Sequence, residues 1–95
     1  MKLHVISRPE KDLEAAVRAG AVCAIFIEDG VLCALRGSPS EPLVRQLLAG
    51  GAELYALKDD LLARGLLERV VEGIHAVGYD GFVELVERNE VVSWR

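Results

Sequence analysis

Two cysteines offer the most versatile chemistry in this chain, because a thiolate is a strong nucleophile. Cys23 and Cys33 fit neither a disulfide framework nor a C-x-x-C pattern, so any sulfur chemistry would rest on a single thiol. Cys33 follows a predicted strand end near a predicted helix start, where the helix dipole favours the thiolate of a persulfide carrier. Its neighbours Leu32 and Ala34 favour the alternative, a small buried core residue. Cys23 lies within an apolar stretch and is interpreted as structural.

Other titratable residues form weaker patterns. His4 and His75 lack a third ligand at a regular spacing, which makes a metal site a poor interpretation of them. Glu28 and Asp29 form an acid pair suited to proton transfer, but an acid followed by glycine is above all a turn signal. Arg8 is placed where a guanidinium can hold an anion, although a solvated arginine is the commoner case. Since the sequence contains no catalytic triad, phosphate loop or metal cluster, we expect no independent enzyme, cofactor or metal.

Composition and charge exclude several classes of protein. The 95 residues are 52% apolar and 27% charged, which predicts a single packed domain over residues 1–95. A net charge of −4 and a pI near 5.1 argue against direct binding of nucleic acid, which needs clustered Lys and Arg. The uncharged stretch 19–27 is too short to span a membrane, and no signal-peptide pattern opens the chain. We therefore expect a cytoplasmic protein without membrane contact.

The elements that must position these side chains follow from apolar runs and turn signals. Strands are predicted at Leu3–Ile6, Ala21–Ile27, Glu53–Leu57, Ile74–Val77 and Val91–Trp94, with helices between them. This alternation predicts an α/β fold: a mostly parallel sheet of about five strands with helices on both faces. The stretch Val31–Leu35 is compatible with a helical turn or a continued strand. The direction of the last strand also stays open.

Polar residues mark the predicted helix starts. Ser7 with Glu10, and Ser38 with Glu41, have the spacing of a capping box. Asp80 is a predicted cap for the last helix. The inward residues expected on that helix are Phe82, Leu85 and Val86.

In open parallel sheets, ligands bind beyond the carboxyl ends of the strands. The segments expected at that edge are Ser7–Arg8, Glu28–Gly30, Leu57–Lys58 and Tyr79–Asp80. Trp94 stands next to the C-terminus, where so large a ring is hard to bury in a small domain, so we expect it to fill an interface.

Several segments together carry a family resemblance. They are Leu3–Pro9, Ile27–Val31, Leu54–Leu57, Asp60–Leu66, Tyr79–Leu85 and the ending Ser93–Trp94. In this order, and over nearly the whole chain, they resemble the TusB/DsrH family. The resemblance implies a DsrE-like layered fold and the role of a small subunit in a cytoplasmic sulfur-relay complex. Such a complex contains TusC-like and TusD-like sister subunits and passes persulfide sulfur toward 2-thiolation of the wobble uridine of tRNA.

The resemblance also bears on the cysteines. The active cysteine of the TusD-like sister falls around Leu57, and some DsrH-type members carry one within the segment matching Glu14–Gly20, but this chain has no cysteine at either place. An accessory, non-catalytic subunit is therefore favoured. One alternative is DsrEFH-type sulfur trafficking in sulfur oxidation, with Cys33 as the catalytic carrier. Another, from a different class, is a stand-alone homo-oligomeric α/β module that binds a small ligand.

Overall fold

The computed structural model describes residues 1–93, which form alternating strands and helices. Within these residues the strands are β1 (Lys2–Ile6), β2 (Cys23–Phe26), β3 (Glu53–Leu57), β4 (His75–Val77) and β5 (Glu90–Ser93). The α-helices are α1 (Lys11–Arg18), α2 (Glu41–Ala49), α3 (Lys58–Ala63) and α4 (Tyr79–Arg88). Two 3₁₀ helices, η1 (Glu28–Ala34) and η2 (Leu67–Arg69), complete the elements.

The strands form one five-stranded sheet in the order β4-β3-β2-β1-β5. Every pairing in the sheet is parallel, which confirms the predicted α/β fold. The central strand β2 is buried along its whole length, as expected of a parallel strand with helices over both faces. β5 runs parallel to β1, with Val91 opposite Leu3, so the direction that the sequence left open is now known.

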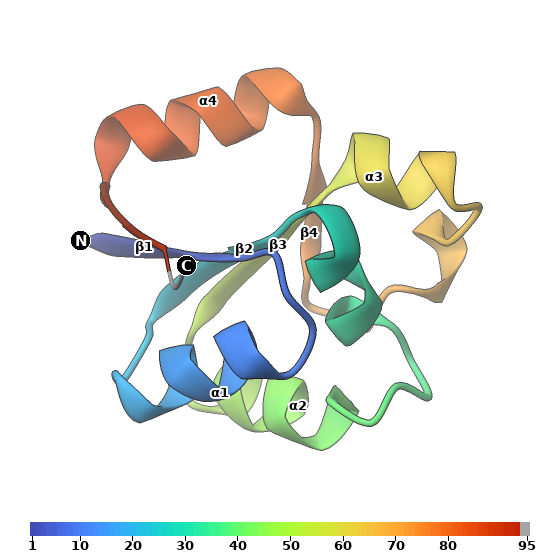
Figure 1. Ribbon diagram of the computed structural model, residues 1–95, viewed down its shortest axis with the longest axis horizontal. Helices are drawn as coiled ribbons and strands as arrows, with labels where there is room; N and C mark the ends of the chain where they lie inside the picture. The colour runs from blue at the N-terminus through green and yellow to red at the C-terminus, as the bar shows by residue number, and fades with distance from the viewer. Residues whose placement is uncertain (94–95) are drawn as a thin grey trace.

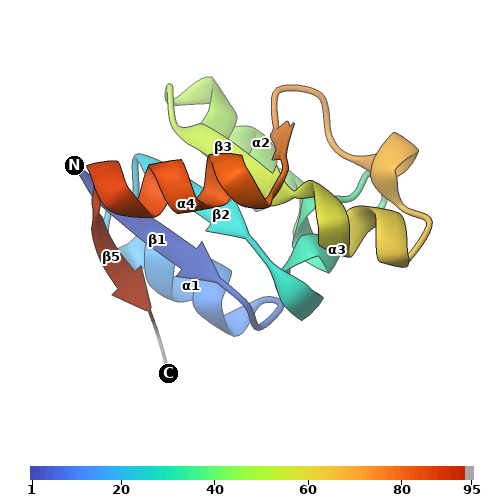
Figure 2. The same ribbon diagram turned by 90° about the horizontal axis from the view of Figure 1, so that it is seen from above.

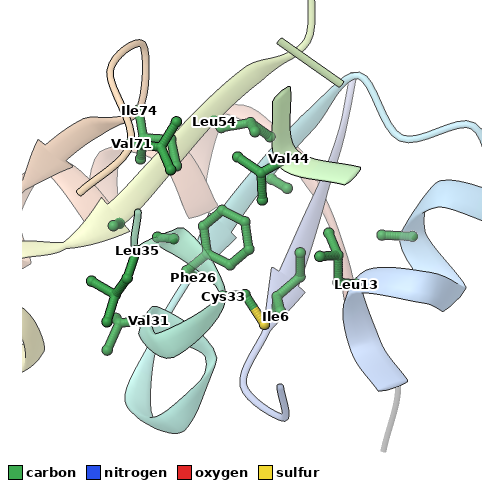
Figure 3. Packing of buried hydrophobic residues seen from close by; sticks show 14 of the residues in the cluster. Ile6, Leu13, Phe26, Val31, Cys33, Leu35, Val44, Leu54, Val71 and Ile74 are labelled. Atoms are coloured by element: carbon green, nitrogen blue, oxygen red, sulfur yellow. The ribbon is translucent and has the colours of Figure 1, made fainter. Parts of the chain in front are cut away.

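Helices α1 and α2 cover one face of the sheet, which we call the closed face (Figure 1). Its core is centred on Phe26 of β2, with Ile6 of β1 beside it (Figure 3). Leu13 of α1 and Val44 of α2 point into this core and are fully buried. Because burying one such side chain is worth about 1.5–3 kcal/mol, this layer supplies most of the apolar stabilisation.

Helix α4 alone covers the opposite face, which we call the open face (Figure 1). Phe82 and Leu85 pack on the sheet there, as predicted, but no residue of α4 is fully buried. Val86 was predicted to point inward, and this is wrong, because 37% of it is exposed. A helix is about 10 Å wide and a five-stranded sheet is about 19 Å wide, so a single helix leaves sheet surface uncovered.

The first predicted capping box does not form. α1 begins at Lys11 with no side-chain cap, and Glu10 before it has a left-handed backbone (φ 67°). Asp12 takes the expected role of Ser7 and Glu10: its carboxylate accepts the backbone N–H of Ser7 at 3.1 Å and of Arg8 at 2.8 Å. The side chain of Asp12, in the first turn of α1, therefore holds the loop that precedes the helix.

The second predicted capping box forms only in part. α2 begins at Glu41 behind Ser40, and Ser38 lies outside the helix start. The Glu41 carboxylate does reach back, and it accepts the backbone N–H of Gly37 at 2.6 Å. Glu41 thus forms its hydrogen bond with the turn before α2 and not with the residue that caps the helix.

The structure also decides two predictions elsewhere, one for the start of α4 and one for the stretch Val31–Leu35. α4 begins at Tyr79 directly after the extended Gly78, so Asp80 lies in its first turn and the prediction of Asp80 as the cap is wrong. The undecided stretch Val31–Leu35 is mostly helical: η1 runs to Ala34, and Leu35 then forms a single antiparallel bridge to Val70.

None of the helices within residues 1–93 is long and apolar enough to cross a membrane. Trp94, the residue expected to fill an interface, lies outside the described residues.

Candidate functional site

The parallel sheet gathers the predicted functional loops at its carboxyl edge. The segments after β1, β2, β3 and β4 all leave the sheet on that edge, because all the strands point the same way. η1 and α3 lie side by side there, as Figure 2 shows from above. The carboxyl edge is therefore the candidate functional site.

Gly30 anchors this edge through a close backbone contact. A Cβ atom at Gly30 would overlap the carbonyl oxygen of Ile6 at the end of β1. The same carbonyl accepts the N–H of Ile27 at 2.9 Å, and Gly30 donates its own N–H to Ile27 at 2.8 Å. Only glycine fits here, so the turn signal in the sequence marks the point where η1 packs directly on the end of β1.

The predicted acid pair, Glu28 and Asp29, lies where η1 contacts α3. Glu28 has a left-handed backbone (φ 50°), and its N–H donates to the Asp60 carboxylate at 2.6 Å. The Asp29 carboxylate forms an ion pair with Arg64 at 2.8 Å. These contacts tie η1 to α3 and favour the turn interpretation of Glu28 and Asp29 over proton transfer.

A buried carboxylate holds the loop after β1. Asp12 is fully buried, and besides the two backbone N–H groups it binds the guanidinium of Arg8 at 2.7 Å. Burial opposes ionisation of Asp12, but the hydrogen bonds from Arg8 and Ser7 outweigh it and lower the pKa of this carboxyl. The Arg8 side chain, considered above as an anion site, is thus held by Asp12.

The role of Asp12 in holding the loop after β1 was not predicted from the sequence. Acids in the first turn of a helix are common because they complement the helix dipole, so Asp12 had no feature to distinguish it. Its position one turn after Arg8 was the available signal for the ion pair.

Cys33, the predicted carrier candidate, lies inside the closed face at the end of η1, next to Ile6 (Figure 3). Its Sγ accepts the backbone N–H of Glu10 at 3.4 Å and the hydroxyl of Ser40 at 3.6 Å. These donors stand before α1 and α2, so the sulfur faces two helix starts. Only 2% of Cys33 is exposed, so the sulfur is shielded from reagents in this structure.

Cys23 lies on the other side of the sheet, among the apolar residues under α4. Burial, and after it the nearby carboxylate of Glu53, raise the pKa of the Cys23 thiol. A buried thiol that resists ionisation is a poor nucleophile, which supports the structural interpretation of Cys23.

The two histidines do not come together. His4 is buried in β1, where burial, and then the charge of Lys2, lower the pKa of its imidazole. His75 is exposed in β4 beside the ring of Tyr55, with ring centroids 5.7 Å apart. Since β2 and β3 separate the two strands, these histidines cannot share a ligand, and no group of three metal-binding side chains occurs within residues 1–93.

An apolar hollow of about 230 Å³ lies at the opposite, amino edge of the sheet. It opens between the ends of α1 and α2, with Val17, Val22, Leu43 and Leu47 in its wall. This hollow holds no residue from the carboxyl-edge loops. This hollow is thus separate from the side chains that the sequence marked for chemistry.

Comparisons with known proteins identify relatives across nearly the whole chain. The family model described as "DsrH like protein" matches residues 10–92. The chain is 40% identical over 97 residues to Protein TusB of Serratia proteamaculans, covering 97% of this chain and 99% of that protein. It is 41% identical over 86 residues to Protein TusB of Erwinia tasmaniensis, covering 87% of each. The similarity therefore extends over both faces of the sheet and the carboxyl-edge loops.

Proposed function

The chain belongs to the family of DsrH-like proteins, and from this premise we propose that it is the small subunit of a cytoplasmic sulfur-relay complex. It supports the transfer of persulfide sulfur toward 2-thiolation of the wobble uridine of tRNA, together with TusC-like and TusD-like subunits. The observation that carries this proposal is the end-to-end similarity to proteins named TusB.

The side chains support an accessory role within that complex. Both cysteines are buried, and the carboxyl-edge acids Asp12, Asp29 and Asp60 are engaged in structural contacts. The net charge of −4 gives the chain little attraction for the tRNA backbone. The thiol exchange and the tRNA contact then belong to the partner subunits and to downstream proteins.

The test is the 2-thiouridine content of tRNA in a strain lacking this chain, measured by mass spectrometry of nucleosides. We expect the modification to disappear and to return with the wild-type chain and with the double variant Cys23→Ala, Cys33→Ala. Full thiolation in the deletion strain would refute the proposed function. Rescue by the wild type alone, with a folded double variant, would refute the accessory role.

A second candidate is DsrEFH-type sulfur trafficking with Cys33 as carrier. It is favoured by the position of the Cys33 sulfur, which accepts the N–H of Glu10 and the hydroxyl of Ser40 in front of two helix starts. In the transfer step the Cys33 thiolate attacks the outer sulfur of a donor persulfide. The donor S–S bond breaks as the new S–S bond on Cys33 forms, and the donor leaves as a thiolate.

Intact mass after incubation with a persulfide donor separates the two candidates. A gain of sulfur in the wild type and in Cys23→Ala, but not in Cys33→Ala, would establish Cys33 as a carrier. No gain in the wild type would remove the carrier candidate and leave the accessory role. A stable homo-oligomer that forms without sister subunits would instead favour the stand-alone ligand-binding module.

A further inference from the structure

One side of α4 carries apolar side chains that the sheet does not cover. The inward side chains Phe82 and Leu85 pack on the open face, whereas Tyr79, Val83 and Val86 repeat at intervals of four and three residues along a neighbouring stripe. Of these, Tyr79 is 63% exposed and Val86 is 37% exposed. The apolar arc of the helix is thus wider than its contact with the sheet.

The direction of this stripe follows from Arg88. Burial raises the pKa of the Tyr55 phenol in β3, and the positive charge of Arg88 opposes that rise. Because a charge must be nearby to act in this way, Arg88 lies on the β3 side of α4. With 3.6 residues per turn, Val86 lies about half a turn around the helix from Arg88 and so faces β1 and β5. Figure 2 shows β5 and the end of β1 extending beyond α4 on that side.

The strands continue the apolar surface. Val91 of β5 is opposite Leu3, which is buried under α4, so Val91 belongs to the open face, where it is 44% exposed. Val5 lies on the same face and is only partly buried. We call these residues the α4–β5 patch: Val5, Tyr79, Val83, Val86 and Val91.

Acidic side chains border the patch on its solvent side. Asp80 and Glu87 are seven residues apart, so they lie in one row along α4, next to the stripe. Neither has an ion pair with another residue of the part of the chain that the structure describes, whereas Glu84 is neutralised by Arg88 at 3.0 Å. The row therefore presents uncompensated negative charge beside an apolar surface.

This charge decides between possible occupants. A second copy, docked patch to patch about a twofold axis, would bring two acidic rows to the same interface, where like charges repel. Anionic lipids and nucleic acids would be repelled in the same way. A protein surface with an apolar centre and a border of Lys or Arg complements both features.

We propose that the α4–β5 patch is the docking surface for a sister subunit that presents an apolar centre bordered by basic side chains. This inference rests on the proposed function, because it names the surface through which the chain joins its complex. Since the patch lies on the open face, docking would also bury the part of the sheet that α4 leaves uncovered.

The test uses the complete chain co-expressed with the TusC-like and TusD-like subunits of the same organism. The variant Val86→Glu is compared with Val22→Glu, a matched control at a valine that is 54% exposed at the amino edge, away from the patch. We expect Val86→Glu to weaken assembly roughly a hundredfold, because the new carboxylate would be buried unpaired. Val22→Glu should assemble like the wild type. Assembly is measured by size exclusion with light scattering and by titration.

A charge variant tests the acidic border separately. Asp80→Lys with Glu87→Lys keeps the apolar stripe and should weaken assembly at least about tenfold, with the loss reduced at high salt. Circular dichroism and thermal unfolding check that each variant retains the wild-type fold.

The outcomes separate the two proposals. If the wild-type chain does not assemble with these subunits, the proposed function fails. If it assembles and folded Val86→Glu assembles equally well, the docking surface is refuted while the proposed function stands. A homodimer of the isolated chain that Val86→Glu converts to a monomer would also refute the docking surface, because the occupant would be a second copy.

Discussion

The two faces of the sheet are built from the same strands and are stabilised to different extents. On the closed face, two helices and η1 enclose a continuous core around Phe26. On the open face, one helix packs over Leu3, Cys23 and Ile25, and its own side chains stay partly exposed. The stability of this domain therefore resides mainly in the closed-face layer, and the open-face layer keeps exposed apolar side chains.

The largest expected difference between the faces concerns the two phenylalanines of the chain, Phe26 and Phe82. Phe26 is fully buried, so Phe26→Ala should lower the free energy of unfolding by about 3–5 kcal/mol. Phe82 is only partly buried, so Phe82→Ala should cost about 1–2 kcal/mol. Urea denaturation of both variants makes the comparison, and equal losses would contradict the unequal roles of the two faces.

The carboxyl edge of the closed face should be nearly as sensitive at Gly30. Gly30→Ala places a methyl group against the Ile6 carbonyl and should cost about 3 kcal/mol, because two backbone segments must move apart. Gly20→Ala is the matched control, since Gly20 has a left-handed backbone with open space around it. That variant should cost only about 1 kcal/mol. Thermal unfolding midpoints give both values, and a smaller loss for Gly30→Ala than for Gly20→Ala would argue against the close contact.

The Asp12 network should make the stability of the domain depend on acidity. The pKa of Asp12 is lowered in the folded state, so its ionised form stabilises the fold above its ordinary pKa, and this contribution is lost as pH falls through the folded value. Asp12→Asn should cost about 1–3 kcal/mol at pH 7 and flatten the acid limb of the stability profile.

Urea denaturation between pH 2.5 and pH 7 measures this effect of Asp12. Glu14→Gln is the control, since Glu14 is exposed and only loosely paired with Arg18 at 4.0 Å. An unchanged acid limb in Asp12→Asn would show that the buried carboxylate does not stabilise the loop after β1.

The smallest expected effect is at Val86 on the open face. Val86→Ala should change the free energy of unfolding by less than about 0.5 kcal/mol, because little area is lost and alanine favours the helix. The matched Val44→Ala in α2 should cost about 2 kcal/mol, since Val44 is fully buried. Parallel urea titrations compare the two, and a large loss at Val86 would mean that the α4–β5 patch stabilises the isolated domain.

Much of the fold could be predicted from residue patterns because the relevant interactions are local. Apolar runs and turn signals placed every strand, and the inward positions of Phe82 and Leu85 followed from helical spacing. The wrong predictions are the inward direction of Val86 and the polar caps at the helix starts. In place of the capping box predicted at Ser7, the Asp12 carboxylate bonds the turn before α1. Of the pair predicted at Ser38 and Glu41, only Glu41 makes a hydrogen bond of this kind, to the backbone of Gly37.

The candidate site was predicted less completely, because its chemistry depends on contacts between segments distant in the sequence. The sequence indicated the loops at the carboxyl edge and singled out Cys33. It could not show that the Cys33 sulfur receives hydrogen bonds from Glu10 and Ser40, which are 23 and seven residues away. The ion pair of Asp29 with Arg64, 35 residues apart, was equally out of reach.

The element types, their alternation and hence the parallel sheet follow from the residue pattern, because local periodicity decides which face of each element is apolar. The burial of Cys33, the need for glycine at position 30 and the exposed side of α4 emerge only when the elements pack together. All three depend on which segments, distant in the sequence, come to lie on each face of the sheet when the strands and helices pack. Two helices close over one side of this five-stranded sheet, and a single helix cannot close over the other.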